Sequence, residues 1–160
     1  MNLQQLRKIM VFYGRFTPSY TQIGYRTRAL LWRDPKPDFA GQTWLVTGAS
    51  GGLGRFMALE AARLGATVIA VARNQSKLDQ VVADAHANGA DRIETAVCDF
   101  SLQADTQRLV NDLVGQGRKI DVLVNNAGVC CAGEVGEMPI DDWRWTVNVN
   151  LMGAIYGCHA

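Results

Sequence analysis

The stretch Thr47 to Gly54 reads Thr-Gly-Ala-Ser-Gly-Gly-Leu-Gly and decides the fold of this chain. It follows the apolar run Thr43 to Val46 and precedes a helical pattern that begins at Arg55. Glycine allows positive φ and removes the Cβ that would keep a phosphate away from the backbone. The helix presents free N–H groups and a partial positive charge. Strand, glycine turn and helix predict a dinucleotide site, with a plain flexible turn as the alternative.

Apolar, β-rich runs alternate with helical patterns along the chain. Strands are predicted at 43–46, 67–72, 92–97 and 120–124, and helices at 55–64, 76–88, 103–114 and from Pro139 onward. Ser76 is expected to cap the second of these helices. The last helix is expected to carry its apolar residues on one side, namely Trp143, Val147, Leu151, Ala154 and Ile155.

This alternation predicts the α/β class. Short connections and right-handed crossovers give a Rossmann-type, doubly wound parallel sheet in the order 3-2-1-4. Ligands of such sheets bind at the carboxyl ends of the strands, beside the first strand. The glycine turn lies at that place.

Composition and charge divide the chain into two parts. The 160 residues are 48% hydrophobic and 19% charged, which fits one globular domain. Residues 1–40 hold seven Lys/Arg and two Asp/Glu, whereas residues 41–160 hold nine and thirteen. The prolines of Asp34–Asp38 predict a linker between a basic, aromatic-rich extension at 1–38 and the domain at 39–160. The acidic domain offers no basic stripe, which argues against a nucleic-acid partner.

The four cysteines have no metal-ligand spacing, and two of them are adjacent. We therefore expect neither a metal site nor a disulfide framework. No apolar run is long enough to span a membrane, and the first residues lack the pattern of a secretory signal. A cytoplasmic setting is the expectation.

The arrangement resembles the short-chain dehydrogenase/reductase family, whose cofactor turn is Thr-Gly-x-x-x-Gly-x-Gly. Thr47, Gly48, Gly52 and Gly54 match that turn in register, and the family's Asn-Asn-Ala-Gly signature appears at Asn125 to Gly128. Physically, the asparagine amides are expected to tie this strand to its neighbours, although a polar strand exit is the simpler alternative. The resemblance implies cofactor contacts at Gly48, Ser50, Gly51, Gly52, Leu53, Gly54, Arg73, Asn74, Asp99, Phe100, Asn126, Ala127 and Gly128.

The end of the second strand predicts which cofactor fits. NAD sites generally place an acid there, whereas the 2′-phosphate of NADP needs a cation. The chain reads Val-Ala-Arg-Asn at 71–74, with no acid, so Arg73 predicts NADP(H) over NAD(H). An ordinary solvated arginine is the alternative. The resemblance gives Asp99 the adenine amino group as its partner, and the alternative for Asp99 is a turn aspartate.

The resemblance also assigns Asn150 to the family's helix asparagine, which helps hold a proton-relaying water. The family's proton donor is a tyrosine in Tyr-x-x-x-Lys, assisted by an upstream serine. Here Tyr156 is followed four residues later by Ala160, so serine, tyrosine and lysine have no counterpart. Because hydride transfer to a carbonyl needs a group that protonates the alkoxide, the chain as given is predicted to be inactive.

The sequence therefore predicts the cofactor-binding portion of a longer reductase of carbonyl or alcohol substrates, or a truncated product. The strand at 120–124 would then be an uncovered edge on which the chain self-associates. The alternative function is a non-catalytic module that binds a nucleotide or a partner.

The extension at 1–38 contains a short family resemblance and a set of basic and aromatic residues. Residues 20–25, Tyr-Thr-Gln-Ile-Gly-Tyr, resemble the head of members related to dehydrogenase/reductase family member 12. Two interpretations remain open: contact with an anionic membrane surface, or packing of the aromatics against the domain. The residues concerned are Arg7, Lys8, Arg15, Arg26, Arg28 and Arg33, with Phe12, Phe16 and Trp32.

Overall fold

The computed structural model describes residues 3–30 and 37–160, apart from the side chains at 15–20, 23, 27 and 28. The chain divides into two compact units, Met1–Lys36 and Pro37–Ala160. Several predictions for the extension lie outside the described part, among them those on the side chains of Arg15, Phe16, Arg28, Trp32 and Arg33 and on most of the linker.

The first unit consists of α1 (Leu3–Tyr20) and α2 (Gln22–Ala29). Thr21 separates them, and its hydroxyl accepts a hydrogen bond from the Gly24 N–H at 3.3 Å, which satisfies a free donor in the first turn of α2. Among the described residues, no helix combines the length and the apolar character needed to cross a membrane.

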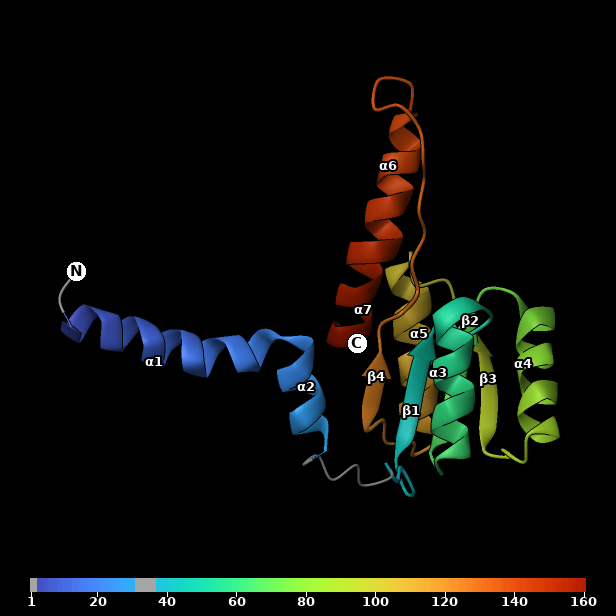
Figure 1. The fold of residues 1–160 in the computed structure, drawn as a ribbon. Helices are drawn as coiled ribbons and strands as arrows, with labels where there is room; N and C mark the ends of the chain where they lie inside the picture. Colours follow the sequence, from blue (N-terminus) through green and yellow to red (C-terminus); the bar gives the residue numbers. More distant parts are fainter. Residues whose placement is uncertain (1–2, 31–36) are drawn as a thin grey trace. The chain divides into compact units, whose positions relative to one another are not determined.

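The second unit is built on a parallel sheet (Figure 1) of β1 (Thr43–Thr47), β2 (Thr67–Ala72), β3 (Ile93–Val97) and β4 (Val122–Val124). Its order, β3-β2-β1-β4, confirms the predicted 3-2-1-4 topology. Thr47 pairs with Val71, and Ala72 pairs with Val97, so neighbouring strands end almost level. The residues that follow the strands therefore gather along one edge of the sheet.

Helices cover both faces of this sheet. Figure 1 shows α3 (Gly52–Arg63) in front of it and α5 (Gln103–Gly115) behind. Helix α4 (Gln75–Ala87) packs in the same buried cluster as α3. Along β2, Val68 and Ala70 are buried in the cluster on the α3 and α4 side, whereas Ile69 and Val71 are buried with Leu109 of α5. Burial on both faces explains why β2 is apolar throughout.

Two predicted helix starts are wrong. Helix α3 begins at Gly52 and not at Arg55, so two glycines of the turn lie in its first helical turn. Helix α4 is capped by Asn74, whose side-chain oxygen accepts from the Lys77 N–H at 3.0 Å. Ser76 lies within the first turn and cannot be the cap, because the cap residue must have the extended backbone that Asn74 adopts, with φ −110° and ψ 108°.

The last helical stretch is not one regular α-helix. It consists of α6 (Ile140–Val147), the π-helix η1 (Asn148–Met152) and α7 (Gly153–His159). Side chains of its apolar side remain exposed, with exposed fractions of 42% for Trp143, 48% for Val147, 56% for Leu151 and 46% for Ile155. The apolar spacing is therefore present, but most of this side is not part of the core.

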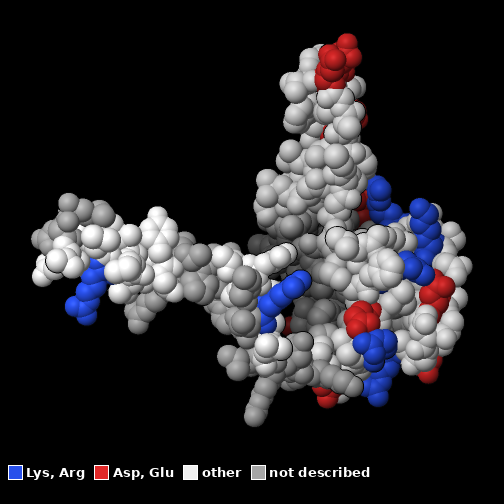
Figure 2. All heavy atoms as spheres, in the orientation of Figure 1, with Lys and Arg blue, Asp and Glu red and all other residues white. Residues whose placement is uncertain are grey.

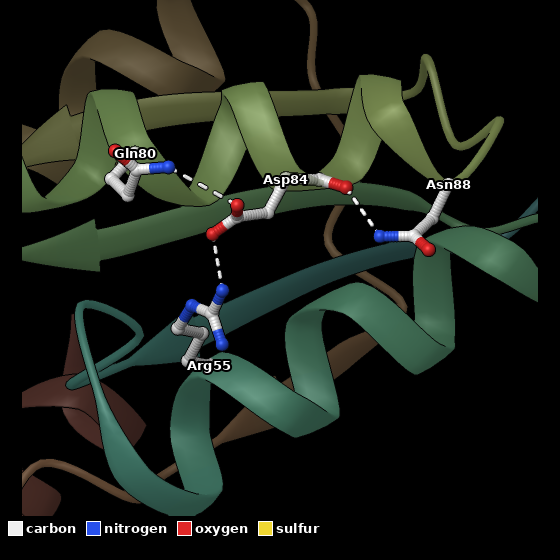
Figure 3. Close-up of polar contacts among 4 residues, drawn as sticks. All are labelled: Arg55, Gln80, Asp84 and Asn88. Carbon is white, nitrogen blue, oxygen red and sulfur yellow. Dashed lines mark hydrogen bonds and ion pairs between the residues drawn. The ribbon is translucent and has the colours of Figure 1, made fainter.

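An ion pair joins α3 to α4 next to the glycine turn (Figure 3). The Arg55 guanidinium contacts the Asp84 carboxylate, which also accepts from the Gln80 amide at 3.1 Å. The Asn88 amide donates to the Asp84 backbone carbonyl at 2.6 Å. Because Arg55 is one residue after Gly54, this network fixes the start of α3 against α4.

The network predicts an acid-dependent loss of stability. The hydrogen bond from Arg55, followed by that from Gln80, lowers the pKa of Asp84. A lowered folded-state pKa gives stability that is fully present above the unfolded-state pKa of about 4 and is lost as the pH falls through the folded value. We expect wild type to lose its advantage over Asp84→Asn in urea unfolding below about pH 4. An advantage that stays constant down to pH 2 contradicts this role.

Candidate cofactor site

The hydroxyl of Thr47 joins the carboxyl ends of β1 and β4. Thr47 is 1% exposed, and its Oγ1 donates to the Val124 carbonyl at 3.1 Å. The same oxygen accepts from the N–H groups of Asn126 and Ala127 at 3.0 and 2.9 Å. The Asn126 side-chain amide donates to the Thr47 carbonyl at 2.9 Å. The prediction that an asparagine amide ties this strand to its neighbour is thus confirmed for Asn126.

Two glycines allow the turn to lie directly on this junction. Gly48 has φ +67°, and a Cβ there would lie 2.8 Å from the Cα of Ala127. A Cβ at Gly54 would overlap both the Asn126 amide nitrogen and the Gly48 carbonyl. No other residue type fits either position without moving the backbone.

The first turn of α3 opens toward the same place. Gly51 occupies the N-cap with an extended backbone and has no side chain to cap the helix, and the first turn contains no acid. The first N–H groups of a helix lack intrahelical partners and carry partial positive charge. This end of α3 is therefore suited to bind an anion.

A cleft of about 410 Å³ lies at the carboxyl ends of all four strands. It brings together ten of the predicted positions, which are Gly48, Ser50, Gly51, Leu53, Arg73, Asp99, Phe100, Asn126, Ala127 and Gly128. Because the strands end almost level, residues far apart in the sequence, such as Gly48 and Gly128, line the same cleft.

Four predicted residues do not line the cleft. Gly52 and Gly54 shape the first turn of α3, and Gly54 is buried beneath it. The side chain of Asn74 is occupied in capping α4. Asn150, in η1, accepts from the Val129 N–H at 2.7 Å and donates to the Val129 carbonyl at 2.8 Å. Its amide thus holds the chain segment that follows β4.

The cleft also contains residues that sequence reasoning missed. Four apolar or weakly polar residues also line it, namely Ala72, Cys98, Val129 and Val149. Ala72 ends β2 and Cys98 directly follows β3, so the predicted strand boundaries could have indicated that both residues line the cleft. Val149 comes from η1, and its place depends on how the last helical stretch packs, which no local pattern encodes.

The charges of the cleft are few and separated. Among the described residues that line it, Arg73 is the cation and Asp99 the acid. The Arg73 guanidinium lies over the ring of Trp145, 6.0 Å from its centroid. The first carboxylate oxygen of Asp99 accepts from the N–H and hydroxyl of Ser101 at 2.9 and 2.7 Å. Asp99 is therefore a turn aspartate that also faces the cleft.

Cys98 lines the cleft with a buried, uncharged side chain. Its burial raises the pKa of the thiol to about 11, so the thiol stays protonated at neutral pH. Among the described residues, His, Cys, Asp and Glu side chains do not form a group of three or more that could hold a metal ion.

Residues 42–160 match the family model of the short chain dehydrogenases. The chain belongs to the short-chain dehydrogenase family. This family assignment rests on three quarters of the sequence and agrees with the topology of the sheet.

Relatives in this family are named for different substrates. Mouse epidermal retinol dehydrogenase 2 is 29% identical over 158 residues, which is 97% of this chain and 49% of that protein. The 3beta-hydroxysteroid dehydrogenase of Mediterraneibacter gnavus is 38% identical over 121 residues, 75% of this chain and 44% of that protein. The chain thus spans about half the length of the curated relatives it matches.

A solved family member has the same fold. The short chain dehydrogenase/reductase from Burkholderia phymatum, in complex with NAD, is similar with a TM-score of 0.69 and 33% identity. The match covers 77% of this chain and 43% of that one. The family binds nicotinamide dinucleotides, and the Rossmann-type fold of this chain is the part that such a cofactor needs.

Proposed function

We propose that this chain is the NADP(H)-binding portion of an oxidoreductase that acts on a carbonyl or alcohol substrate. The observation that carries the proposal is Arg73, which lines the cleft directly after β2 at a position where an NAD site generally has a carboxylate. A guanidinium pairs strongly with a phosphate. The choice of NADP(H) rests on this residue and not on the Burkholderia relative, which binds NAD.

The residues present fit such a cofactor. Gly48 lines the cleft and lets the turn lie against Ala127, and the uncapped start of α3 offers N–H donors for a pyrophosphate. Ser50 would add its hydroxyl, Asp99 would accept from the adenine amino group, and Arg73 would bind the 2′-phosphate. The bound cofactor would supply or accept the hydride.

We assign Asn150 a role in holding the catalytic end of the site. Both hydrogen bonds of its amide go to Val129, so it fixes the segment after β4 against the π-helix. Tyr156 is followed four residues later by Ala160 and not by the lysine of the family's Tyr-x-x-x-Lys pattern. We therefore propose that these 160 residues bind the cofactor and do not themselves protonate the substrate.

Arg73→Asp tests the cofactor assignment. Replacing a cation by an anion beside the 2′-phosphate should weaken NADPH binding by about tenfold or more, since one charge-assisted contact contributes roughly 1.5–3 kcal/mol. NADH binding should stay within about twofold, because NADH carries no 2′-phosphate. Cofactor fluorescence on titration with each dinucleotide measures both affinities.

Arg92→Asp is the matched control, because Arg92 is exposed and precedes β3 at the opposite edge of the sheet. It should leave both affinities unchanged. Trp145→Ala should lower NADPH affinity in the same direction but less, since it removes the ring beneath the guanidinium. An unchanged NADPH to NADH ratio in Arg73→Asp would defeat the assignment, and absence of binding at millimolar cofactor would defeat the site in this chain.

The alternative proposal is a non-catalytic module that binds a nucleotide or a second copy. Within residues 37–160, β4 pairs with β1 on one side only, and its Val122, Leu123 and Val124 are half-buried. An open apolar edge of this kind favours self-association. A mass that rises with concentration in sedimentation equilibrium supports it, and a constant monomer mass counts against it.

All four cysteines are free thiols, which supports a reducing, cytoplasmic compartment. For residues 1–38 we propose contact with a membrane surface, a role separate from the cofactor cleft.

A further inference from the structure

Helix α1 has an exposed apolar side. Leu6, Ile9, Met10 and Tyr13 follow the i, i+3, i+4, i+7 spacing that places side chains on one face of a helix. Their exposed fractions are 38%, 45%, 65% and 61%. Leu3, one turn earlier on the same side, is 86% exposed. Exposed apolar side chains in a continuous stripe mark a surface that meets an apolar partner.

The opposite side of α1 carries its two described cations, together with one glutamine and one valine. Gln4, Arg7, Lys8 and Val11 follow the same spacing, offset by about half a turn of the helix. Figure 2 shows blue cationic side chains on α1 and no red among its described atoms. Arg7 and Lys8 thus lie on the side of α1 opposite the apolar stripe, although Val11 is also exposed on that side.

The charge of this part of the chain is of one sign. Residues 1–33 contain six Lys/Arg and no Asp/Glu, whereas residues 34–160 contain ten and fifteen. Such a segment is attracted to an anionic surface. An apolar stripe opposite the cations fits a helix that lies in the plane of a membrane interface, with the stripe toward the acyl chains and the cations at the headgroups.

We propose that α1 is an interfacial helix that binds anionic lipid, with Leu6, Ile9, Met10 and Tyr13 in the apolar boundary and Arg7 and Lys8 at the phosphate level. The assignment refines the membrane contact proposed for residues 1–38 and needs no cofactor in the cleft. The competing arrangement is a helix whose apolar side packs against the protein itself.

The full chain is tested with vesicles of phosphatidylcholine alone and of phosphatidylcholine with about 30% phosphatidylserine, by co-sedimentation. Wild type should partition at least about tenfold more strongly to the anionic vesicles and lose this preference at high salt. A double Arg7→Gln, Lys8→Gln variant should bind them several-fold more weakly. Equal binding to both vesicles, or none to either, would overturn the proposal.

Ile9→Gln and Val11→Gln are a matched pair. Both replace a β-branched aliphatic side chain of similar exposure, 45% and 51%, without changing charge, but on opposite sides of α1. Ile9→Gln should weaken binding to anionic vesicles by about tenfold, because it removes one buried aliphatic side chain from the boundary. Val11→Gln should stay within about twofold. Equal losses in the two variants contradict the assigned orientation.

Melting temperature and NADPH titration distinguish lipid binding by α1 from packing of its apolar stripe against the protein and from the cofactor assignment. A lower melting temperature for Ile9→Gln than for Val11→Gln, with vesicle binding unaffected, would place the stripe against the protein and overturn the membrane assignment. NADPH titration of the same variants should match wild type. Failure of wild type to bind NADPH, with vesicle binding intact, would reject the cofactor assignment and leave the lipid assignment standing.

Discussion

Gly54→Ala is expected to abolish measurable dinucleotide binding and to destabilise the chain by about 1–3 kcal/mol or more. The added Cβ would overlap the Asn126 amide and the Gly48 carbonyl. Both neighbours are held in place, because Asn126 donates to the Thr47 carbonyl at 2.9 Å and Gly48 follows the last residue of β1. The turn must therefore move, and the N–H groups at the start of α3 move with it. Urea unfolding and NADPH titration measure the two effects.

Gly115→Ala is the control for this prediction. Gly115 ends α5, has no positive φ, and a Cβ there would meet nothing within 4 Å. The change should leave stability unaltered or raise it by about 0.5–1 kcal/mol, because alanine is the better helix former. If Gly54→Ala behaves like Gly115→Ala, the close approach of turn and junction is not rigid.

Thr47→Val is expected to cost about 2–4 kcal/mol of unfolding free energy. Valine has the same shape but no hydroxyl, so the Ala127 N–H loses its partner at 2.9 Å. The Val124 carbonyl and the Asn126 N–H lose one of their two bonds and keep the 3.0 Å bond that they make to each other. Unpaired polar groups in a buried place cost more than a hydrogen bond contributes. Cofactor affinity should fall as well, since Asn126 and Ala127 line the cleft.

Thr106→Val is the matched control, because Thr106 is equally buried at 0% exposure. Its hydroxyl donates to the Leu102 carbonyl at 3.3 Å, and this carbonyl keeps the bond from the Thr106 N–H at 3.2 Å. No backbone group loses its only partner, so the loss should stay below about 1 kcal/mol. Equal losses in the two variants would show that the number of shared bonds at Thr47 does not matter.

The order of the sheet and ten of the residues that line the cleft were predictable because each rests on a local pattern. The apolar run of β2 indicates a strand covered on both faces, and a glycine turn after β1 places the cleft beside the first strand. Parallel strands that end level then bring Arg73 and Asp99 to the same wall. These inferences need only the pattern along the chain and the rules for connecting strands.

Other features depend on packing and were not predictable. Asn74 competes with Ser76 for the cap of α4, and the backbone conformation at the strand exit decides between them. The π-helix around Asn150 lets its amide reach both backbone groups of Val129, which are 21 residues away. The Arg73 guanidinium lies over the ring of Trp145 in α6, a contact between residues far apart in the sequence that no local pattern predicts.

The sequence by itself determined which elements form, their order in the sheet and the place of the glycine turn, because hydrophobic period and glycine position act over a few residues. Tertiary structure decided how closely the turn lies on the β4 junction, where Thr47 serves three backbone groups at once. It also decided that the apolar side of α6 to α7 stays exposed. Such contacts join residues far apart in the chain, and their geometry depends on the whole fold.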